Sequence, residues 1–399
     1  MIGFISLTLK ILFFLLPIFP WIKEYSSTMG NIAELLLIVN IYICSLIIVV
    51  KYRNKLLFKQ FILMNIIGTI LLIYALICNK GIGEGLAGLR IYIEFIIAIM
   101  GISIVYVHQG KKEVFIIIKY LFYITIILSI LGVIQFIVPD VIVNMHSKEV
   151  YSNLRIKSNF ESFSMYNRVM SLMNDPNVYS VYLIIAYTIL NKLNLEKIIS
   201  KKITCVSKLL ILLNIILTNS RQGLLLYIIY LILTSIVKFI KYYNSKKIEL
   251  SINTFIKIGL AFIVILLIIF NLQYILENVL RIDTLINLNG RAEKNELVKE
   301  IILNNGIIRI LFGHGISASR DFIFENSYLL LIYQVGVIGM AIIASIIMRM
   351  FLNIINITKD RANGYIIPLI IFFIAMYTGD WIVIPQITIP LVGAIFTLI

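Results

Sequence analysis

Four short polar elements of this chain carry arginines and carboxylate, amide or hydroxyl side chains that could act on a phosphorylated substrate. They are Arg168 ahead of Asp175-Pro176-Asn177, then Thr218-Asn219-Ser220-Arg221, Gly290-Arg291, and Glu325-Asn326-Ser327-Tyr328. The guanidinium group is a fixed fork of donors that binds phosphate oxygens in pairs. A glutamate or histidine near such a fork could accept a proton if its pKa were suitably tuned. These residue types therefore favour anion binding combined with proton transfer.

The elements that must position these residues are hydrophobic helices. The 399 residues are 60% hydrophobic and 14% charged, with a mean hydropathy of +0.99. Roughly 20 apolar residues span the hydrocarbon of a bilayer as a helix, which satisfies its own backbone groups. We therefore predict an all-α polytopic membrane protein with a single transmembrane domain, residues 1–399. Its twelve predicted spans lie near 3–21, 31–50, 56–78, 88–108, 114–138, 176–192, 203–219, 222–240, 254–275, 326–350, 364–380 and 382–399.

The distribution of basic residues predicts which side of the membrane each loop occupies. Lys and Arg concentrate in loops that share a side with the N-terminus, such as 51–59 and 192–208. Because basic loops resist translocation, we expect cytoplasmic N- and C-termini in the cytoplasmic membrane. Two long extracytoplasmic loops, about 139–175 and 276–325, then carry the polar elements. The net charge of +15 reflects this topology, and no nucleic-acid partner is needed to explain it.

Local patterns predict how some polar elements are held. Asp175 followed by Pro176 is typical of a helix start. Residues 292–303 have a helical pattern with Leu297, Val298, Ile301 and Ile302 on one face, which predicts an amphipathic helix that lies on the membrane surface or covers a cleft. Arg291 would stand at its N-terminus, where free amides favour an anion.

Charge is sparse in the first five spans, and cofactor spacings are missing from the sequence. Arg90 and Glu94 are four residues apart, and we interpret them as a helical ion pair that satisfies itself. The cysteines lack metal or redox spacing and the acidic residues form no convincing metal-binding group, so we predict neither a metal ion nor a cofactor.

The order and spacing of the four polar elements, continued by Gly336-Val337-Ile338-Gly339, resemble the O-antigen polymerase and O-antigen ligase superfamily, which includes capsular and exopolysaccharide repeat-unit polymerases. The resemblance covers about residues 160–345. It implies a membrane glycosyltransferase fold of the GT-C kind and a substrate linked to polyprenyl diphosphate. In ligases a histidine commonly precedes the Asn of the last element. This chain has Glu325 there, which favours a polymerase of the capsular type.

The resemblance also implies site residues. Arg221 and Arg291 would hold the diphosphate, with Arg168 as a weaker third contact. The general base would be Glu325 or, as a second choice, His314, whose flanking glycines allow close approach to substrate. Asn326 and Tyr328 would position sugar hydroxyls.

Each of these residues also has a purely structural interpretation. Arg221 could extend from a helix end toward water, Glu325 could cap its helix, and His314 could be an ordinary loop residue. The structural interpretation is the weaker one for Arg221 and the stronger one for His314.

The expected function is a polysaccharide polymerase that moves a growing glycan from polyprenyl diphosphate to a sugar hydroxyl of a lipid-linked repeat unit. Its partners would be the lipid-linked glycan, the bilayer, and possible chain-length regulator and flippase proteins. A ligase of the same superfamily is an alternative within this class. A flippase or transporter of lipid-linked oligosaccharides is the alternative from another class, and it should place charge along a central cavity.

Overall fold

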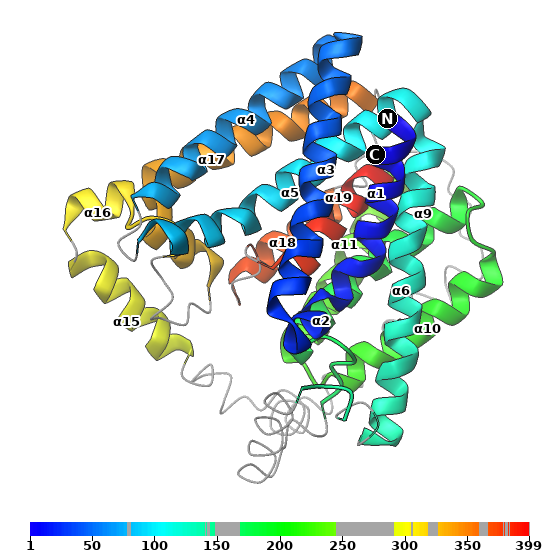
Figure 1. Cartoon of the computed structure of the whole chain (residues 1–399). Coiled ribbons are helices and arrows are strands. Elements are labelled where there is room, and N and C mark those ends of the chain that lie inside the picture. Colours follow the sequence, from blue (N-terminus) through cyan, green and yellow to red (C-terminus); the bar gives the residue numbers. More distant parts are fainter. Residues whose placement is uncertain are drawn as a thin grey trace.

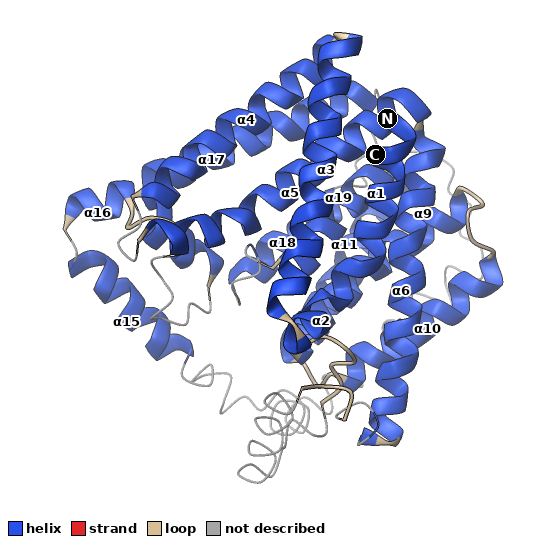
Figure 2. Ribbon diagram, in the orientation of Figure 1, coloured by secondary structure: helices blue, strands red, loops and turns tan. Residues whose placement is uncertain are grey.

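The computed structural model describes residues 1–77, 81–139, 141, 144–147, 168–244, 291–304, 306–317, 326–358, 366–377, 379, 382 and 384–398. The described residues form helices and connecting turns, with no strand among them (Figure 2). The N-terminal half contains α1 (Ile2–Leu15), η1 (Leu16–Ile18), α2 (Phe19–Tyr25), α3 (Ser27–Tyr52), α4 (Lys55–Leu76), α5 (Ile82–Gln109) and α6 (Lys111–Ile137). The C-terminal half contains α9 (Pro176–Leu195), α10 (Lys201–Leu217), α11 (Arg221–Asn244), α15 (Arg291–Asn304), α16 (Ile307–Phe312), α17 (Ser327–Thr358), α18 (Ile366–Tyr377) and α19 (Pro385–Leu398).

Side-chain caps define where several helices begin. The Ser26 hydroxyl accepts the Met29 N–H at the start of α3, and Asn54 caps α4. Asp175 Oδ1 accepts the N–H groups of Asn177 and Val178, at 2.6 and 3.1 Å, and Pro176 is the first residue of α9. The predicted helix start at Asp175 is therefore confirmed.

The helices have the lengths and compositions of a helical membrane protein. A helix lies in every predicted span except 254–275, which falls outside the described residues. Within the described part, six helical segments are long and apolar enough to cross a membrane: Ile2–Tyr25, Ser27–Tyr52, Lys55–Leu76, Ile82–Gln109, Lys111–Ile137 and Ser327–Ile355. Four shorter apolar helices come from α9, α11, α18 and α19. The full number of twelve spans stays a prediction.

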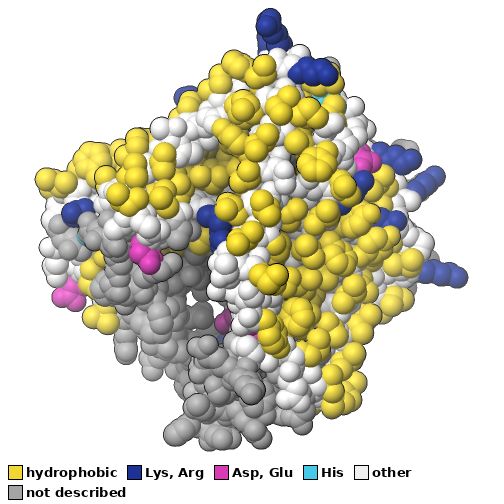
Figure 3. Space-filling view, viewed as in Figure 1, with side chains coloured by type: hydrophobic (Ala, Val, Ile, Leu, Met, Phe, Trp, Pro, Cys, Tyr) yellow, Lys and Arg dark blue, Asp and Glu magenta, His cyan; other side chains and the backbone are white. Residues whose placement is uncertain are grey.

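The helices form one bundle in which α19 packs against α5, α6 and α9, and α1 packs against α3, α5 and α6. In Figure 1 both termini are seen toward the upper part of the bundle. Hydrophobic side chains cover much of the described surface in Figure 3, and Lys and Arg side chains gather at its upper and right edges. A surface this apolar is suited to contact with lipid.

A break inside α17 is closed by the turn that follows α16. Gly336 has φ 70° and ψ 174°, which is not helical. The N–H groups of His314 and Gly315 donate to the carbonyl oxygens of Tyr333 and Gln334, both at 2.9 Å, just before the break. The turn thus satisfies carbonyl groups that a kinked helix would leave open.

Residues 291–304 form α15, so the predicted helix at 292–303 is confirmed, although its apolar face differs from the expected one. Val298 and Ile302 are buried against Leu330 and Tyr333 of α17. Leu297, expected on the same face, is 59% exposed. Positions four apart lie on one helical stripe, and Leu297 is about 100° away from Val298 around the axis. The contact with α17 is therefore narrower than the sequence indicated.

Candidate functional site

Two of the four predicted polar elements meet at Asn177. Arg168 donates from Nε to the Thr218 carbonyl oxygen at 3.0 Å and from Nη2 to Asn177 Oδ1 at 2.9 Å. The Ser220 hydroxyl donates to the same Asn177 oxygen at 3.0 Å. Arg221, the next residue, begins α11. The first and second elements therefore meet through Arg168, Asn177 and Ser220, and Arg221 follows Ser220 in the chain. We call these four residues the arginine cluster.

Buried hydrogen bonds fix the segment that carries Arg168. Gln135 Oε1 accepts the N–H groups of Met170 and Ser171, at 3.0 and 2.9 Å. The Ser171 hydroxyl donates to the Leu128 carbonyl oxygen at 2.8 Å. Both acceptors belong to α6. The segment that carries Arg168 is thus held against α6 by hydrogen bonds.

Gln222 is a site candidate that the sequence did not reveal. Its side chain is buried in the first turn of α11, and neither its amide oxygen nor its amide nitrogen has a hydrogen-bond partner among the described residues. A buried amide without partners costs about 1–3 kcal/mol, which a ligand or a bound water would offset. A glutamine in an apolar helix gives no sign of this in sequence.

Ionisable residues of α2, α3 and α5 form a second polar cluster. Lys23 and Arg90 both form ion pairs with Glu34, the latter at 3.5 Å, and Arg90 also pairs with Glu94 at 3.2 Å. Arg90 Nη1 donates to Asn31 Oδ1 at 2.9 Å. The predicted pair of Arg90 with Glu94 is confirmed, but it belongs to a larger network. The sequence signal for this network is the presence of charged residues inside apolar segments, because charged side chains are costly in a bilayer.

This network borders a cleft of 380 Å³ between α2, α5 and α19. Its polar lining consists of Lys23, Glu24, Arg90, Asn174 and Gln386. Asn174 directly precedes the cap of α9, so the cleft reaches the segment that carries Arg168. Residues 168–177 therefore connect the cleft to the arginine cluster along the chain.

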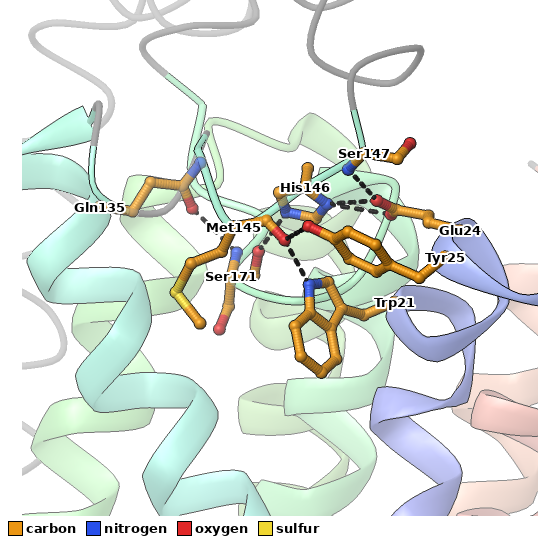
Figure 4. A network of polar contacts seen from close by, with 8 residues as sticks. All are labelled: Trp21, Glu24, Tyr25, Gln135, Met145, His146, Ser147 and Ser171. Atoms are coloured by element: carbon orange, nitrogen blue, oxygen red, sulfur yellow. Dashed lines mark hydrogen bonds and ion pairs between the residues drawn. The ribbon is translucent and has the colours of Figure 1, made fainter.

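A buried histidine links the turn at 144–147 to α2 and to residue 171 (Figure 4). His146 Nδ1 lies 2.9 and 3.0 Å from the two carboxylate oxygens of Glu24, and His146 Nε2 lies 3.1 Å from the Ser171 carbonyl oxygen. Both ring nitrogens therefore face acceptors, the Glu24 carboxylate and the Ser171 carbonyl oxygen. The Ser147 N–H also donates to Glu24, at 3.0 Å. Trp21 Nε1 adds a 2.6 Å bond to the Met145 carbonyl oxygen.

The last predicted element is built into helix contacts. Asn326 Oδ1 caps α17 by accepting the N–H groups of Tyr328 and Leu329, at 2.9 and 3.3 Å. The Tyr328 hydroxyl donates to the Phe373 carbonyl oxygen of α18 at 2.8 Å. These bonds give both side chains structural roles. Contact of Asn326 and Tyr328 with sugar hydroxyls stays a prediction.

The two remaining candidates are Glu325 and Arg291. Glu325 lies outside the described residues. Arg291 is the first residue of α15, as predicted, and its side chain is outside the description. α15 packs against α16 and α17, so it adjoins the helix that Asn326 caps. Among the residues that the structure describes, no three His, Cys, Asp or Glu side chains form a group that could hold a metal ion.

His314 is buried and belongs to the turn that closes the break in α17. Its ring stacks on Tyr333 with centroids 4.2 Å apart and planes 11° apart, and Nδ1 donates to the Tyr333 carbonyl oxygen at 3.1 Å. That bond leaves Nε2 as the acceptor nitrogen of the neutral ring. Burial lowers the pKa of His314 from its ordinary 6.5, and the charge of Arg309 lowers it further, while the bond to Tyr333 partly opposes this. His314 is thus held in the neutral form that a general base needs.

The lowered pKa predicts a pH-dependent contribution of His314 to stability. The unfolded chain binds this proton more tightly, so the contribution is complete above about pH 6.5 and is lost as pH falls through the folded pKa. We expect the melting temperature of the wild type in detergent to fall, relative to that of His314→Gln, between about pH 8 and about pH 5. The other two histidines are present in both proteins and cancel in the difference. A difference that does not vary with pH would contradict this prediction.

Comparisons of the chain with protein-family models, with curated proteins and with solved structures found no match.

Proposed function

We propose that this chain is a polysaccharide polymerase of the cytoplasmic membrane. It transfers a growing glycan from a polyprenyl diphosphate to a hydroxyl of a lipid-linked repeat unit. The observation that supports this proposal best is the arginine cluster, in which Arg168 and the segment that ends in Arg221 bind the same Asn177 side chain. The resemblance of the polar elements to the O-antigen polymerase and ligase superfamily points the same way.

The reaction needs few chemical groups from the protein. The acceptor hydroxyl oxygen attacks the anomeric carbon of the donor sugar, and the bond from that carbon to the diphosphate oxygen breaks. The diphosphate leaves with the bonding electrons, and a base takes the hydroxyl proton. Because negative charge grows on the diphosphate, preorganised cations stabilise the transition state most. In this proposal Arg221 and Arg291 supply that charge, with Arg168 as a weaker third contact.

The base in this proposal is Glu325 or His314. The lowered pKa of His314 favours the neutral ring, and in that form Nε2 is the nitrogen that could accept a proton. The turn that carries His314 contacts both α4 and α17. The contact with α4 is the Ile316 N–H, which donates to the Tyr74 carbonyl oxygen at 3.0 Å. Glu325 directly precedes Asn326, the cap of α17. Glu325→Gln would retain a helix cap and remove a base, so loss of extension with normal folding supports the base assignment.

The surface of the bundle suits a substrate with a long lipid tail. Exposed apolar side chains cover α1, α3 and α4 and continue on α10. Two lipid-anchored sugars held on one bundle would react as a nearly unimolecular pair.

One structural feature favours a lipid-linked oligosaccharide flippase or transporter as the second candidate. Glu34 and Glu94 are fully buried within α3 and α5, where they pair with Arg90. Charge inside a bundle is typical of transport pathways.

A single assay separates these activities. The full-length protein, reconstituted in vesicles, would be given one synthetic repeat unit on a short prenyl diphosphate. We expect a ladder of products on a gel. A single shift to a distinct terminal acceptor would identify a ligase, and movement of labelled lipid across the bilayer without transfer would identify a flippase.

A further inference from the structure

We propose that the cleft between α2, α5 and α19 is a second binding site for a diphosphate, next to the arginine cluster and separate from it. Its polar lining is Lys23, Glu24, Arg90, Asn174 and Gln386. In the polymerase this site takes the lipid diphosphate of the acceptor repeat unit, and this role rests on the proposed function. Diphosphate binding itself follows from the chemistry of the cleft.

The two cations of the network lie at the surface of the cleft, and the carboxylates that pair with them lie deeper in the protein. The Lys23 and Arg90 side chains are 23% and 24% exposed, and both line the cleft. Their partners Glu34 and Glu94 are 0% and 1% exposed and do not line it. The carboxylates therefore orient the two cations toward the opening, as outer partners orient the ligands of a metal. A ligand in the cleft meets positive charge.

The one carboxylate in the lining is already engaged. The Glu24 side chain is 3% exposed, and its oxygens accept from His146 Nδ1 and from the Ser147 N–H. Both Glu24 oxygens are therefore already engaged by groups of the turn at 144–147. A cation, by contrast, would face Lys23 and Arg90 directly.

Two amide side chains in the lining can donate to a ligand. Gln386 is 6% exposed and lines the cleft, and its side chain makes no hydrogen bond with the part of the chain that the structure describes. The NH₂ group of Gln386, with that of Asn174, can donate to phosphate oxygens beside the two cations.

The size and depth of the cleft suit a lipid diphosphate. Its volume of 380 Å³ lies within the usual range for small-ligand sites. Lys23 is in the last turn of α2, and Arg90 is eight residues, about 12 Å, from the start of α5. The site is therefore near the end of the bundle, where a phosphate can stay at headgroup height while its tail enters the bilayer.

Binding to the purified full-length protein in detergent tests this proposal without any turnover. The probes are farnesyl diphosphate and inorganic pyrophosphate, titrated by calorimetry. We expect two farnesyl diphosphate sites in the wild type. One site should weaken at least tenfold in Arg221→Gln, and the other at least tenfold in two charge-balanced variants, Lys23→Gln with Glu34→Gln and Arg90→Gln with Glu94→Gln. These pairs remove a cation together with its buried partner, so neither leaves an isolated buried charge.

Single replacement of the carboxylate behind Arg90 is the matched control. Glu94→Gln keeps both cations and leaves Glu34 as the partner that orients Arg90, so it should bind the probe as tightly as the wild type or more tightly. One binding site in the wild type, or wild-type affinities in both paired variants, would overturn the proposal. Equal affinities for pyrophosphate and farnesyl diphosphate would overturn the lipid-linked source of the ligand. Loss of one site in the paired variants, in a protein that extends no glycan, would reject the proposed function and retain this inference.

Discussion

Replacing Arg221 with glutamine should lower the rate of glycan extension at least about 100-fold while the protein stays folded. The expected size is that of removing one preorganised donor from a developing negative charge, which costs about 10²–10³ in rate. Replacement of Arg168 would also remove its hydrogen bonds to the Thr218 carbonyl oxygen and to Asn177. Arg221→Lys should restore only part of the rate, since lysine cannot bind two phosphate oxygens in a fork.

The measurement is the product ladder from a lipid-linked repeat, together with gel filtration and a melting curve for each variant. Arg349→Gln is the matched control, because it removes the same charge from an exposed position of α17. Arg349→Gln should give wild-type ladders. Normal chain length from Arg221→Gln would remove Arg221 from the site and weaken the polymerase proposal.

Replacing Gly336 with alanine should destabilise the bundle by at least about 3 kcal/mol. Its φ of 70° and ψ of 174° lie in a region that is essentially reserved for glycine. A β-carbon there would also stand 2.3 Å from the Leu311 carbonyl oxygen, which is backbone and cannot rotate away. The melting temperature in detergent should fall by roughly 5 °C or more.

Two other glycines separate the causes of this loss. Gly306 has φ 80° but a β-carbon there would meet nothing within 4 Å, so Gly306→Ala measures the backbone strain alone. Gly68 is inside α4 with open space around it, so Gly68→Ala should be neutral or slightly stabilising. If Gly336→Ala melted no lower than Gly306→Ala, the close approach of Leu311 would be wrong.

The sequence predicted the helices well because their signal is local. Long apolar runs, and caps such as Asp175 followed by Pro176, depend only on neighbours in the chain. The break at Gly336 was missed, because Gly336 looks like any glycine in an apolar run. What distinguishes it is a turn at residues 313–315, and contacts between separate segments leave no periodic trace.

The site was predicted in part for the same reason. The elements around Arg168 and Arg221 were recognised by residue type, and their meeting at Asn177 required the fold. The cleft was missed because Lys23, Arg90 and Gln386 belong to three distant helices. Arg90 was assigned only the partner four residues away, since pattern analysis detects neighbours on one helix. Glu34 became its partner through packing of α3 against α5.

The turn at residues 313–316 also constrains how the chain matures after insertion. It reaches α4 through the Tyr74 carbonyl oxygen and α17 through the carbonyl oxygens of Tyr333 and Gln334. α4 leaves the ribosome long before this turn does, and α17 follows it. If synthesis stopped between α4 and α17, the early helices would already be in the bilayer without the contacts through which the turn joins them to the later helices. Variants that loosen the turn should therefore be cleared by membrane proteases even when every helix has inserted, and a lowered amount of protein in cells would be their first visible defect.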